Sequence, residues 1–303
     1  MKKCYRCHSK IEDNNYKNIF GSNVICLKCY NQLYFDKKEI YHCSSCSCLI
    51  YEDIIAYDED DNIICSDCYY NTYNFYDAYY KPIPLFSNND RINNLHVGIE
   101  LEMQFEDRDK FLNKFNTSNN SKFYLKRDGS LDWDNGVEII SHPMTINDMI
   151  ENWKNIFDLF EETYVTKSCG LHFHLDRKYL TKRQIKNIDY IINNFTKSIE
   201  KIGGRNVVDH FWSKRTQKNI NDWGMDTTSC RYVAVNLTNK NTVELRCFDS
   251  TDNWEKFKYI IIAVFALVEY AKYHTFEYFT KTNDDDFRRT FRKYIRRFVN
   301  KLI

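Results

Sequence analysis

Four Cys-x2-Cys pairs occupy the first 68 residues of this 303-residue chain, and they form two copies of one pattern. In each copy, eighteen residues separate the first pair from the second, and the second copy follows at an offset of 39 residues. Units this short cannot bury a core large enough to fold without help, so the cysteines must hold them together. The first unit contains Cys4, Cys7, Cys26 and Cys29, and the second contains Cys43, Cys46, Cys65 and Cys68.

Each unit offers four thiolates at the spacing of a structural tetrahedral zinc site. A disulfide framework is the alternative, but it needs an oxidising compartment that no other feature of the chain suggests. We therefore predict two structural Zn²⁺ ions, one in residues 1–38 and one in residues 39–80, each contributing on the order of 10 kcal/mol to folding. Cys48 is a spare thiol that could replace Cys46, and His8 and His42 flank the predicted ligands as surface or supporting groups.

The cysteine pattern resembles the Cys-only zinc-ribbon or treble-clef half of LIM-type fingers. It departs from a LIM domain because 13 residues separate the units, where a LIM domain has two. Residues 1–86 contain nine Lys and Arg against twelve Asp and Glu, which disfavours binding to a nucleic-acid backbone. We expect a module that recruits a protein or peptide substrate. The alternative is a zinc-stapled cap on the second domain.

The length of the chain predicts more than one domain, and residues 81–95, which contain two of the three prolines, look like a short, stiff linker. The net charge of +1 gives no case for a nucleic-acid or membrane field over the whole chain. Met1 leads directly into lysines and Cys4, unlike a secretory signal. The longest apolar run, residues 260–268, is about half the length of a membrane span. We expect a soluble, intracellular, cytoplasmic protein.

Three short segments of the second half alternate apolar with ionisable residues at period two. As β-strands, each would place two functional groups on one face and its apolar residues on the other. A merely solvated face is the alternative, but such faces usually mix Lys, Thr, Ser and Gln. On one sheet, these groups suit divalent metal and phosphate. The pairs are Glu100 with Glu102, His172 with His174, and Glu244 with Arg246.

The order of the remaining elements predicts an α+β domain with an antiparallel sheet backed by helices on one face. Residues 122–125 and 136–141 read as strands, and 231–237 with 242–246 as a hairpin. Helical spacing covers residues 146–160 and 254–273, and Thr181 with Gln184 predicts a capping box for a helix over residues 181–202. A basic amphipathic helix over residues 283–303 is expected to dock on its own domain, rather than to bind an acidic partner or a membrane surface.

Five motifs of this region occur in an order that resembles the amidoligase family, carboxylate–amine ligases related to glutamine synthetase and glutamate–cysteine ligase. They are Gly-Ile-Glu-Leu-Glu, Asp-Gly-Ser-Leu, Gly-Val-Glu-Ile-Ile-Ser, Cys-Gly-Leu-His-Phe-His-Leu-Asp, and Arg-x4-Asn-Leu followed by Thr-Val-Glu-Leu-Arg-x-Phe. The similarity covers roughly residues 95–279, with no counterpart for the zinc units. It implies a glutamine synthetase-like catalytic fold for residues 96–282. His142 departs from the pattern, because a second proline is expected there.

The resemblance implies ATP- and Mg²⁺-dependent amide formation through an acyl phosphate. By motif position, Glu100 and Glu102 would each bind a different Mg²⁺. His174 would contact an ATP phosphate, and Arg231 and Arg246 would stabilise phosphoryl or acyl-phosphate oxygens. The further implied groups are Glu138 on one metal, His172 and Glu244 on the other, Asp128 as a ligand or ammonium-binding group, and Asn236 as an orienting group.

Other functions are compatible with the same residues. A metal-dependent hydrolase of phosphoesters or amides could use the same face, with a metal-bound water as nucleophile. A catalytically inert zinc-binding adaptor on a degenerate ligase fold is another possibility, and nucleophilic chemistry through Cys169 is the weakest one. The pairing of Glu244 with Arg246 on one strand favours chemistry through a phosphorylated intermediate. We therefore take the ligase as the leading hypothesis, with ATP, two or more Mg²⁺ and two Zn²⁺ as its cofactors.

Overall fold

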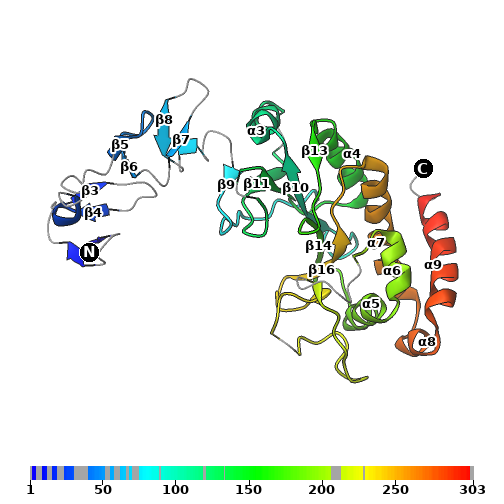
Figure 1. Cartoon of the computed structure of the whole chain (residues 1–303). Coiled ribbons are helices and arrows are strands. Elements are labelled where there is room, and N and C mark those ends of the chain that lie inside the picture. The colour runs from blue at the N-terminus through cyan, green and yellow to red at the C-terminus, as the bar shows by residue number, and fades with distance from the viewer. Residues whose placement is uncertain are drawn as a thin grey trace. The chain divides into compact units, whose positions relative to one another are not determined.

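The structure is a computed structural model, and it divides into two compact units, Met1–Asp77 and Ala78–Ile303 (Figure 1). Each unit is described by itself. The residues that the structure describes are 2–4, 9–11, 16–18, 24–30, 40–51, 55–57, 62–65, 68–69, 75–88, 90–118, 121–132, 134–205, 213–227 and 229–300.

The first unit contains two copies of a pair of short hairpins. β3 and β4 pair antiparallel, and so do β7 and β8, which lie 39 residues further on. β1 pairs with β2 and β5 pairs with β6 in the same two positions of the repeat. The strands are β1 (Lys2–Lys3), β2 (Lys10–Ile11), β3 (Tyr16–Asn18), β4 (Val24–Cys26), β5 (Ile40–His42), β6 (Leu49–Tyr51), β7 (Ile55–Tyr57), β8 (Ile63–Cys65) and β9 (Phe75–Tyr76).

The second unit is built on a sheet with the strand order β15-β16-β14-β10-β12-β11, and β13 also pairs with β10. Neighbouring strands in this order run antiparallel. The strands that carry the alternating motifs are therefore adjacent, with β12 beside β10. Their bounds are β10 (Val97–Phe105), β11 (Phe123–Lys126), β12 (Gly136–Ser141), β13 (Thr163–Tyr164), β14 (Gly170–Asp176), β15 (Val235–Asn236) and β16 (Thr242–Asp249).

Helices cover the apolar face of this sheet, which confirms an α+β architecture with a sheet backed by helices (Figure 1). The long apolar helix α7 contacts α4, α5 and α9. Ile99, Leu101 and Met103 of β10 are fully buried, as expected for residues that alternate with polar ones on a half-covered strand. The helices are α3 (Arg108–Thr117), α4 (Ile146–Phe157), α5 (Lys182–Asn194), α6 (Thr196–Ile202), α7 (Trp254–Tyr273), α8 (Phe276–Lys281) and α9 (Asp284–Val299).

Two predicted elements differ from those in the structure. The helix expected over residues 181–202 begins with the predicted capping box but breaks at Phe195, whose backbone is not helical and whose buried ring stacks on Phe287. The strand expected from Arg231 is reduced to Val235–Asn236. The carbonyl of Ala234 still accepts a hydrogen bond from the N–H of Arg246 on β16, whereas the carbonyl of Tyr232 and the N–H of Ala234 bond to the backbone of Lys214.

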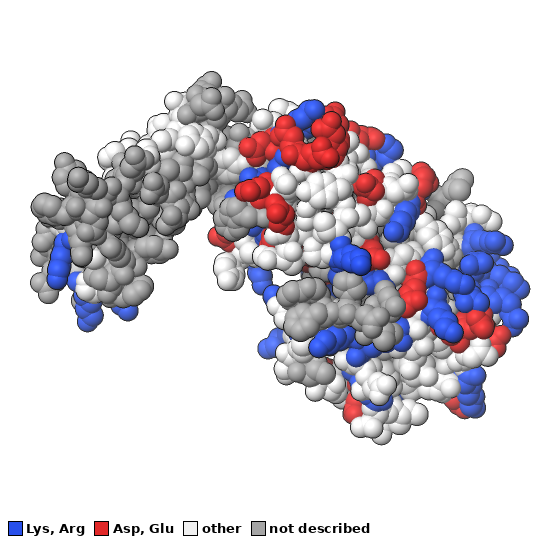
Figure 2. All heavy atoms as spheres, viewed as in Figure 1, with Lys and Arg blue, Asp and Glu red and all other residues white. Residues whose placement is uncertain are grey.

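The C-terminal helix α9 packs on its own domain, as predicted. Phe287, Phe291 and Ile295 are buried, and the helix contacts α6 and α7. Its N-terminal turn holds three Asp and its last turn holds Arg, which suits the helix dipole. Its arginines lie on the outer face, and Figure 2 shows Lys and Arg gathered over this part of the surface. Among the described residues, no helix combines the length and apolar character needed to cross a bilayer.

Residues 81–88 and 90–95, predicted as a linker, bond to the second unit. The backbone N–H of Leu85 donates to Nδ1 of His142 at 3.4 Å, and that of Ser87 donates to the carbonyl of Pro143 at 3.2 Å. Arg91 forms a bidentate ion pair with buried Asp176, with N–O distances of 2.7 and 2.8 Å. This segment is therefore part of the second unit, which begins at Ala78.

Candidate functional site

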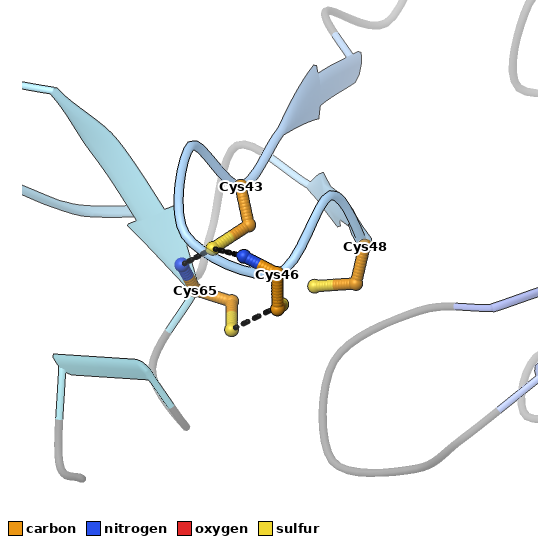
Figure 3. Close-up of side chains that lie close together, drawn as sticks. All are labelled: Cys43, Cys46, Cys48 and Cys65. Carbon is orange, nitrogen blue, oxygen red and sulfur yellow. Dashed lines mark hydrogen bonds between the residues drawn. The ribbon is translucent and has the colours of Figure 1, made fainter.

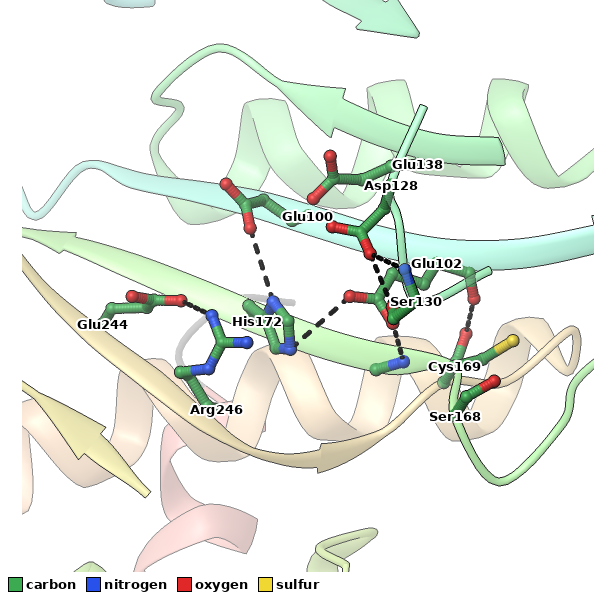
Figure 4. Close-up of polar contacts among 12 residues, drawn as sticks. Glu100, Glu102, Asp128, Ser130, Glu138, Ser168, Cys169, His172, Glu244 and Arg246 are labelled. Carbon is green, nitrogen blue, oxygen red and sulfur yellow. Dashed lines mark hydrogen bonds and ion pairs between the residues drawn. The ribbon is translucent and has the colours of Figure 1, made fainter. Parts of the chain in front are cut away.

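The polar face of the sheet lines a cavity of about 590 Å³. The strand order explains why, since β12, β10, β14 and β16 lie side by side and present alternate residues to the same face. The structure brings together at this cavity all ten residues that the motifs predict for the ligase site. They are Glu100, Glu102, Asp128, Glu138, His172, His174, Arg231, Asn236, Glu244 and Arg246. Figure 4 shows Glu100, Glu102, Asp128, Glu138, His172, Glu244 and Arg246 among them.

One group of potential metal ligands consists of Glu100, His172 and Glu244, from three adjacent strands. One ligand atom from each lies within 4.8 Å of the others. Glu100 is opposite His172 in the register of β10 with β14, and its Oε2 lies 3.3 Å from Nδ1 of His172. His174 borders this group, with Nε2 at 3.1 Å from Oε1 of Glu100 and 4.0 Å from Oε1 of Glu244. Two carboxylates and an imidazole suit a divalent cation.

A second group consists of Glu102, Asp128 and Glu138, again with ligand atoms within 4.8 Å of one another. Glu102 and Glu138 are direct cross-strand neighbours on β10 and β12. Asp128 lies in the turn after β11, where the backbone N–H and hydroxyl of Ser130 donate to its Oδ1 at 2.7 and 2.5 Å. Three close carboxylates in a partly enclosed cavity favour a hard cation with oxygen ligands, such as Mg²⁺.

Electrostatics distinguishes the two groups. Burial and the negative charge of Glu100 raise the pKa of Glu138 well above its usual value, and burial also raises the pKa of Glu102. Burial opposes ionisation of Glu100 too, but attraction to His174 and hydrogen bonds from both histidines hold its pKa well below the usual value. The same attraction outweighs burial at His174 and raises its pKa to about 9. The second group therefore has the greater need of added positive charge.

Arg246 and Asn236 both bind the carboxylate of Glu244. Nη1 of Arg246 donates to Oε1 at 2.5 Å, and Nδ2 of Asn236 donates to Oε2 at 2.6 Å. A register shift between β14 and β16, next to His172, is the irregularity that accompanies this placement of Arg246. Arg231 lies at the exposed rim of the cavity, where Nη2 donates to the hydroxyl of Tyr232 at 2.9 Å.

Three further cationic side chains that line the cavity were not predicted, namely Lys81, Lys126 and Arg205. Nζ of Lys126 lies 3.2 Å from Oε2 of Glu138, its cross-strand neighbour. The guanidinium of Arg205 is almost fully buried and donates to the carbonyls of Ser168 and Cys169. Lys126 could have been found from its alternation with Asp128 along the chain. Arg205 could not, because it follows two glycines at the end of α6 and belongs to no motif.

Two residues that the sequence analysis singled out, His142 and Cys169, lie beside this cavity. His142 lines a second cavity of about 560 Å³, which shares Glu100, Lys126 and His174 with the first. Burial lowers the pKa of His142. Cys169 is buried, and its Sγ accepts a hydrogen bond from the backbone of Thr166 at 3.4 Å, so it is not presented to the cavity as a nucleophile.

The cysteines of the second zinc unit converge, and they could hold a metal such as zinc. The Sγ atoms of Cys43, Cys46, Cys48 and Cys65 lie within 4.8 Å of one another (Figure 3). Sγ of Cys43 accepts hydrogen bonds from the backbone N–H groups of Cys46 at 3.4 Å and Cys65 at 3.3 Å. Burial opposes ionisation of this thiol, but these N–H donors prevail and lower its pKa to about 6. Sγ of Cys65 accepts from the N–H of Cys68 at 3.4 Å.

The first zinc unit, residues 1–38, repeats this arrangement. Ligand atoms of Cys4, Cys26 and Cys29 lie within 4.8 Å of one another, and the N–H of Cys26 donates to Sγ of Cys4 at 3.3 Å. This bond corresponds to the one from Cys65 to Cys43. Cys7 and His8 lie outside the described residues. His42 faces the carbonyl of Ser47, with its Nδ1 at 3.5 Å.

No protein-family model matches this chain, and no curated protein matches it. The prediction of an amidoligase site rests on the five motifs and their order. Every acidic residue and histidine that those motifs supply to the predicted site lies at one cavity, in or beside one of two groups. The two groups are neighbours, because Nε2 of His172 lies 3.8 Å from Oε1 of Glu102.

Proposed function

We propose that the second unit is an ATP- and Mg²⁺-dependent carboxylate–amine ligase. The observation that carries this proposal is the pair of neighbouring ligand groups at a single cavity that is also lined by arginines. One group is on Glu100, His172 and Glu244, and the other is on Glu102, Asp128 and Glu138. Two divalent cations beside cationic side chains are what phosphoryl transfer between bound substrates needs, since the transferring group carries high negative charge.

The three carboxylates of the second group fit Mg²⁺, and the two carboxylates and the imidazole of the first group fit a divalent cation. The raised pKa values of Glu102 and Glu138 reflect burial of carboxylates that lack enough positive charge around them. Lys126 supplies one positive charge to the three acids of the second group. When bound, Mg²⁺ would neutralise phosphate and carboxylate oxygens as a Lewis acid.

The other side chains have distinct parts in the proposed reaction. Arg246, placed by its bond to Glu244, and Arg231 at the rim neutralise charge on the phosphoryl group as the terminal P–O bond of ATP breaks. The substrate carboxylate takes up the phosphoryl group, and ADP leaves. The amine then attacks the acyl carbon, loses a proton and displaces phosphate, which leaves the amide. His174, protonated near neutral pH because Glu100 raises its pKa to about 9, holds a phosphate oxygen.

The zinc units recruit a protein or peptide substrate in this proposal. Their repeated hairpins suit a small recognition module. Their acidic balance disfavours a nucleic-acid partner.

Formation of ADP and phosphate tests the proposal. The full chain is incubated with Mg-ATP and fractionated cell extract, and ADP and new amides are measured by mass spectrometry. Glu100→Ala and Glu244→Ala should abolish ADP formation, because each removes a ligand of the first group. Glu277→Ala is the matched control, since Glu277 lies on the exposed helix α8.

The outcomes separate the alternatives. ATP consumption that survives both site variants would overturn the site assignment. Metal-dependent cleavage of model esters or amides without ATP would favour the hydrolase, although the Glu244–Arg246 pair supports the ligase. Absence of Mg-ATP binding in calorimetry would favour the inert adaptor.

A further inference from the structure

The second zinc unit has one more thiol beside its site than a four-coordinate ion uses. Sγ of Cys48 belongs to the same group, within 4.8 Å, as those of Cys43, Cys46 and Cys65. Cys68 is also next to this group, because its backbone N–H donates to Sγ of Cys65. Structural zinc takes four ligands, so five sulfurs exceed the need by one.

The first zinc unit provides an internal comparison. The N–H of Cys4 donates to the carbonyl of Ser9 at 2.9 Å, and the N–H of Cys43 donates to the carbonyl of Cys48 at 2.9 Å. Each bond spans the first Cys-x2-Cys pair of its zinc unit, at the same positions of the repeat. Residues 9 and 48 are therefore equivalent positions of the repeat, and only the second zinc unit has a thiol there.

The backbone brings Cys46 and Cys48 to the same side. Ser47, between them, adopts a left-handed conformation with a φ of 59°, which is uncommon for a residue with a side chain. Figure 3 shows the sulfur of Cys48 directed toward that of Cys46. The Sγ atoms of Cys46 and Cys65 are 3.7 Å apart, so either Cys46 or Cys48 can complete a set with Cys65.

We propose that Cys46 and Cys48 are interchangeable zinc ligands in the second zinc unit, so that this zinc unit keeps a four-thiolate site when either one is lost. The remaining ligands are Cys43, Cys65 and Cys68. A spare thiolate in contact with the site also lets one ligand replace another without release of the ion. The first zinc unit lacks this capacity, because Ser9 cannot replace Cys7 as a thiolate. The inference rests on zinc binding by both units and is independent of the ligase reaction.

The test counts thiolates at each site in the full chain. The metal is measured by native mass spectrometry, and the number of sulfur ligands by the cobalt(II) absorption spectrum after metal replacement. Wild type should bind two ions, each by four thiolates. Cys46→Ser and Cys48→Ser should both keep this spectrum, whereas the Cys46→Ser/Cys48→Ser double variant should lose one four-thiolate site.

The first zinc unit supplies the matched controls. Cys7→Ser should lose one four-thiolate site, and Ser9→Cys added to Cys7→Ser should restore it by creating the arrangement of the second zinc unit. This rescue stays informative if a variant of the second zinc unit folds poorly. The proposal is overturned if Cys46→Ser loses a four-thiolate site as fully as Cys7→Ser does, or if the Cys46→Ser/Cys48→Ser variant loses none. A wild-type chain without zinc would overturn it together with zinc binding, whatever the outcome for ATP.

Discussion

The backbone N–H of Gly170 donates a hydrogen bond of 2.6 Å to Oε2 of Glu102. The two residues lie on neighbouring strands and are 68 positions apart in the sequence. The hydroxyl of Ser250 binds the carbonyl of Glu102 at 2.5 Å, so both ends of this residue are fixed. The carboxylate is therefore held in place before a cation arrives, which lowers the ordering cost of binding.

Gly170→Ala should weaken binding of a divalent cation by the second ligand group, which contains Glu102. A Cβ at this position would lie 2.6 Å from Nε2 of His172 and 2.9 Å from Nη2 of buried Arg205, so both side chains must shift. We expect a loss of about 1–3 kcal/mol in the unfolding free energy from overpacking, and weaker Mn²⁺ binding in calorimetry.

Gly98→Ala is the control for this change, because its Cβ would meet only ordinary contacts, at 3.5 Å or more. It should keep Mn²⁺ affinity close to that of wild type. Equal Mn²⁺ affinity in the Gly170→Ala variant would contradict the fixed position that we assign to Glu102.

Glu138→Gln should stabilise the metal-free protein while it removes a metal ligand. Burial and the charge of Glu100 raise the pKa of Glu138 and make its ionised form costly. A neutral amide removes that cost, so we expect the unfolding free energy without metal to rise by about 1 kcal/mol. Added Mg²⁺ should stabilise wild type more than the variant, as measured by thermal unfolding with and without the ion. A variant that is less stable without metal would show that the Lys126 ion pair outweighs repulsion.

Much of the site could be predicted because its residues alternate on strands. Glu100, Glu102, His172 and Glu244 face one side at period two, and a sheet in which these strands are adjacent must bring them together. Only the strand order was needed in addition. The capping box at Thr181 and the bounds of α7 were likewise predictable, because both depend on local spacing.

The rest depends on contacts between segments that are distant in sequence. The break at Phe195 is set by its stacking on Phe287, 92 positions away, which no helical pattern around residue 195 reveals. The residues before β15 pair with Lys214, a contact that no alternation of the sequence reveals. Arg205 reaches the site through the fold alone, since its partners are two backbone carbonyls and the carboxylate of Asp249, 44 positions away and 3.2 Å from its Nε.

A buried ion pair away from the site predicts a pH dependence of stability. Asp189 on α5 is fully buried and accepts hydrogen bonds from Nζ of Lys218 at 2.7 Å and from the N–H of Gly224 at 2.8 Å. Burial nevertheless raises its pKa above the usual 3.8. Because the folded value is the higher one, the contribution of Asp189 to stability is greatest below 3.8 and falls as pH rises from there through the folded value.

Urea unfolding across this pH range should show the decrease in wild type, and its absence in Asp189→Asn. Lys218→Met should cost about 3–5 kcal/mol at neutral pH, since it leaves a buried carboxylate unpaired. The double variant should recover most of that loss. A Lys218→Met protein as stable as wild type would mean that solvent reaches Asp189.

Removal of zinc should unfold the first unit and leave the second folded. The buried cluster of the first unit includes Cys4 and Cys29, so its few apolar residues are held together by the metal ligands themselves. The second unit has an extensive core around α7, with Phe257 and Ile260 fully buried, and does not depend on zinc. A zinc chelator followed by limited proteolysis should therefore digest residues 1–77 and leave a resistant fragment that begins near Ala78. Readdition of zinc before the protease should protect the first unit again. Equal resistance of both units after complete zinc removal would show that the hairpins fold without metal.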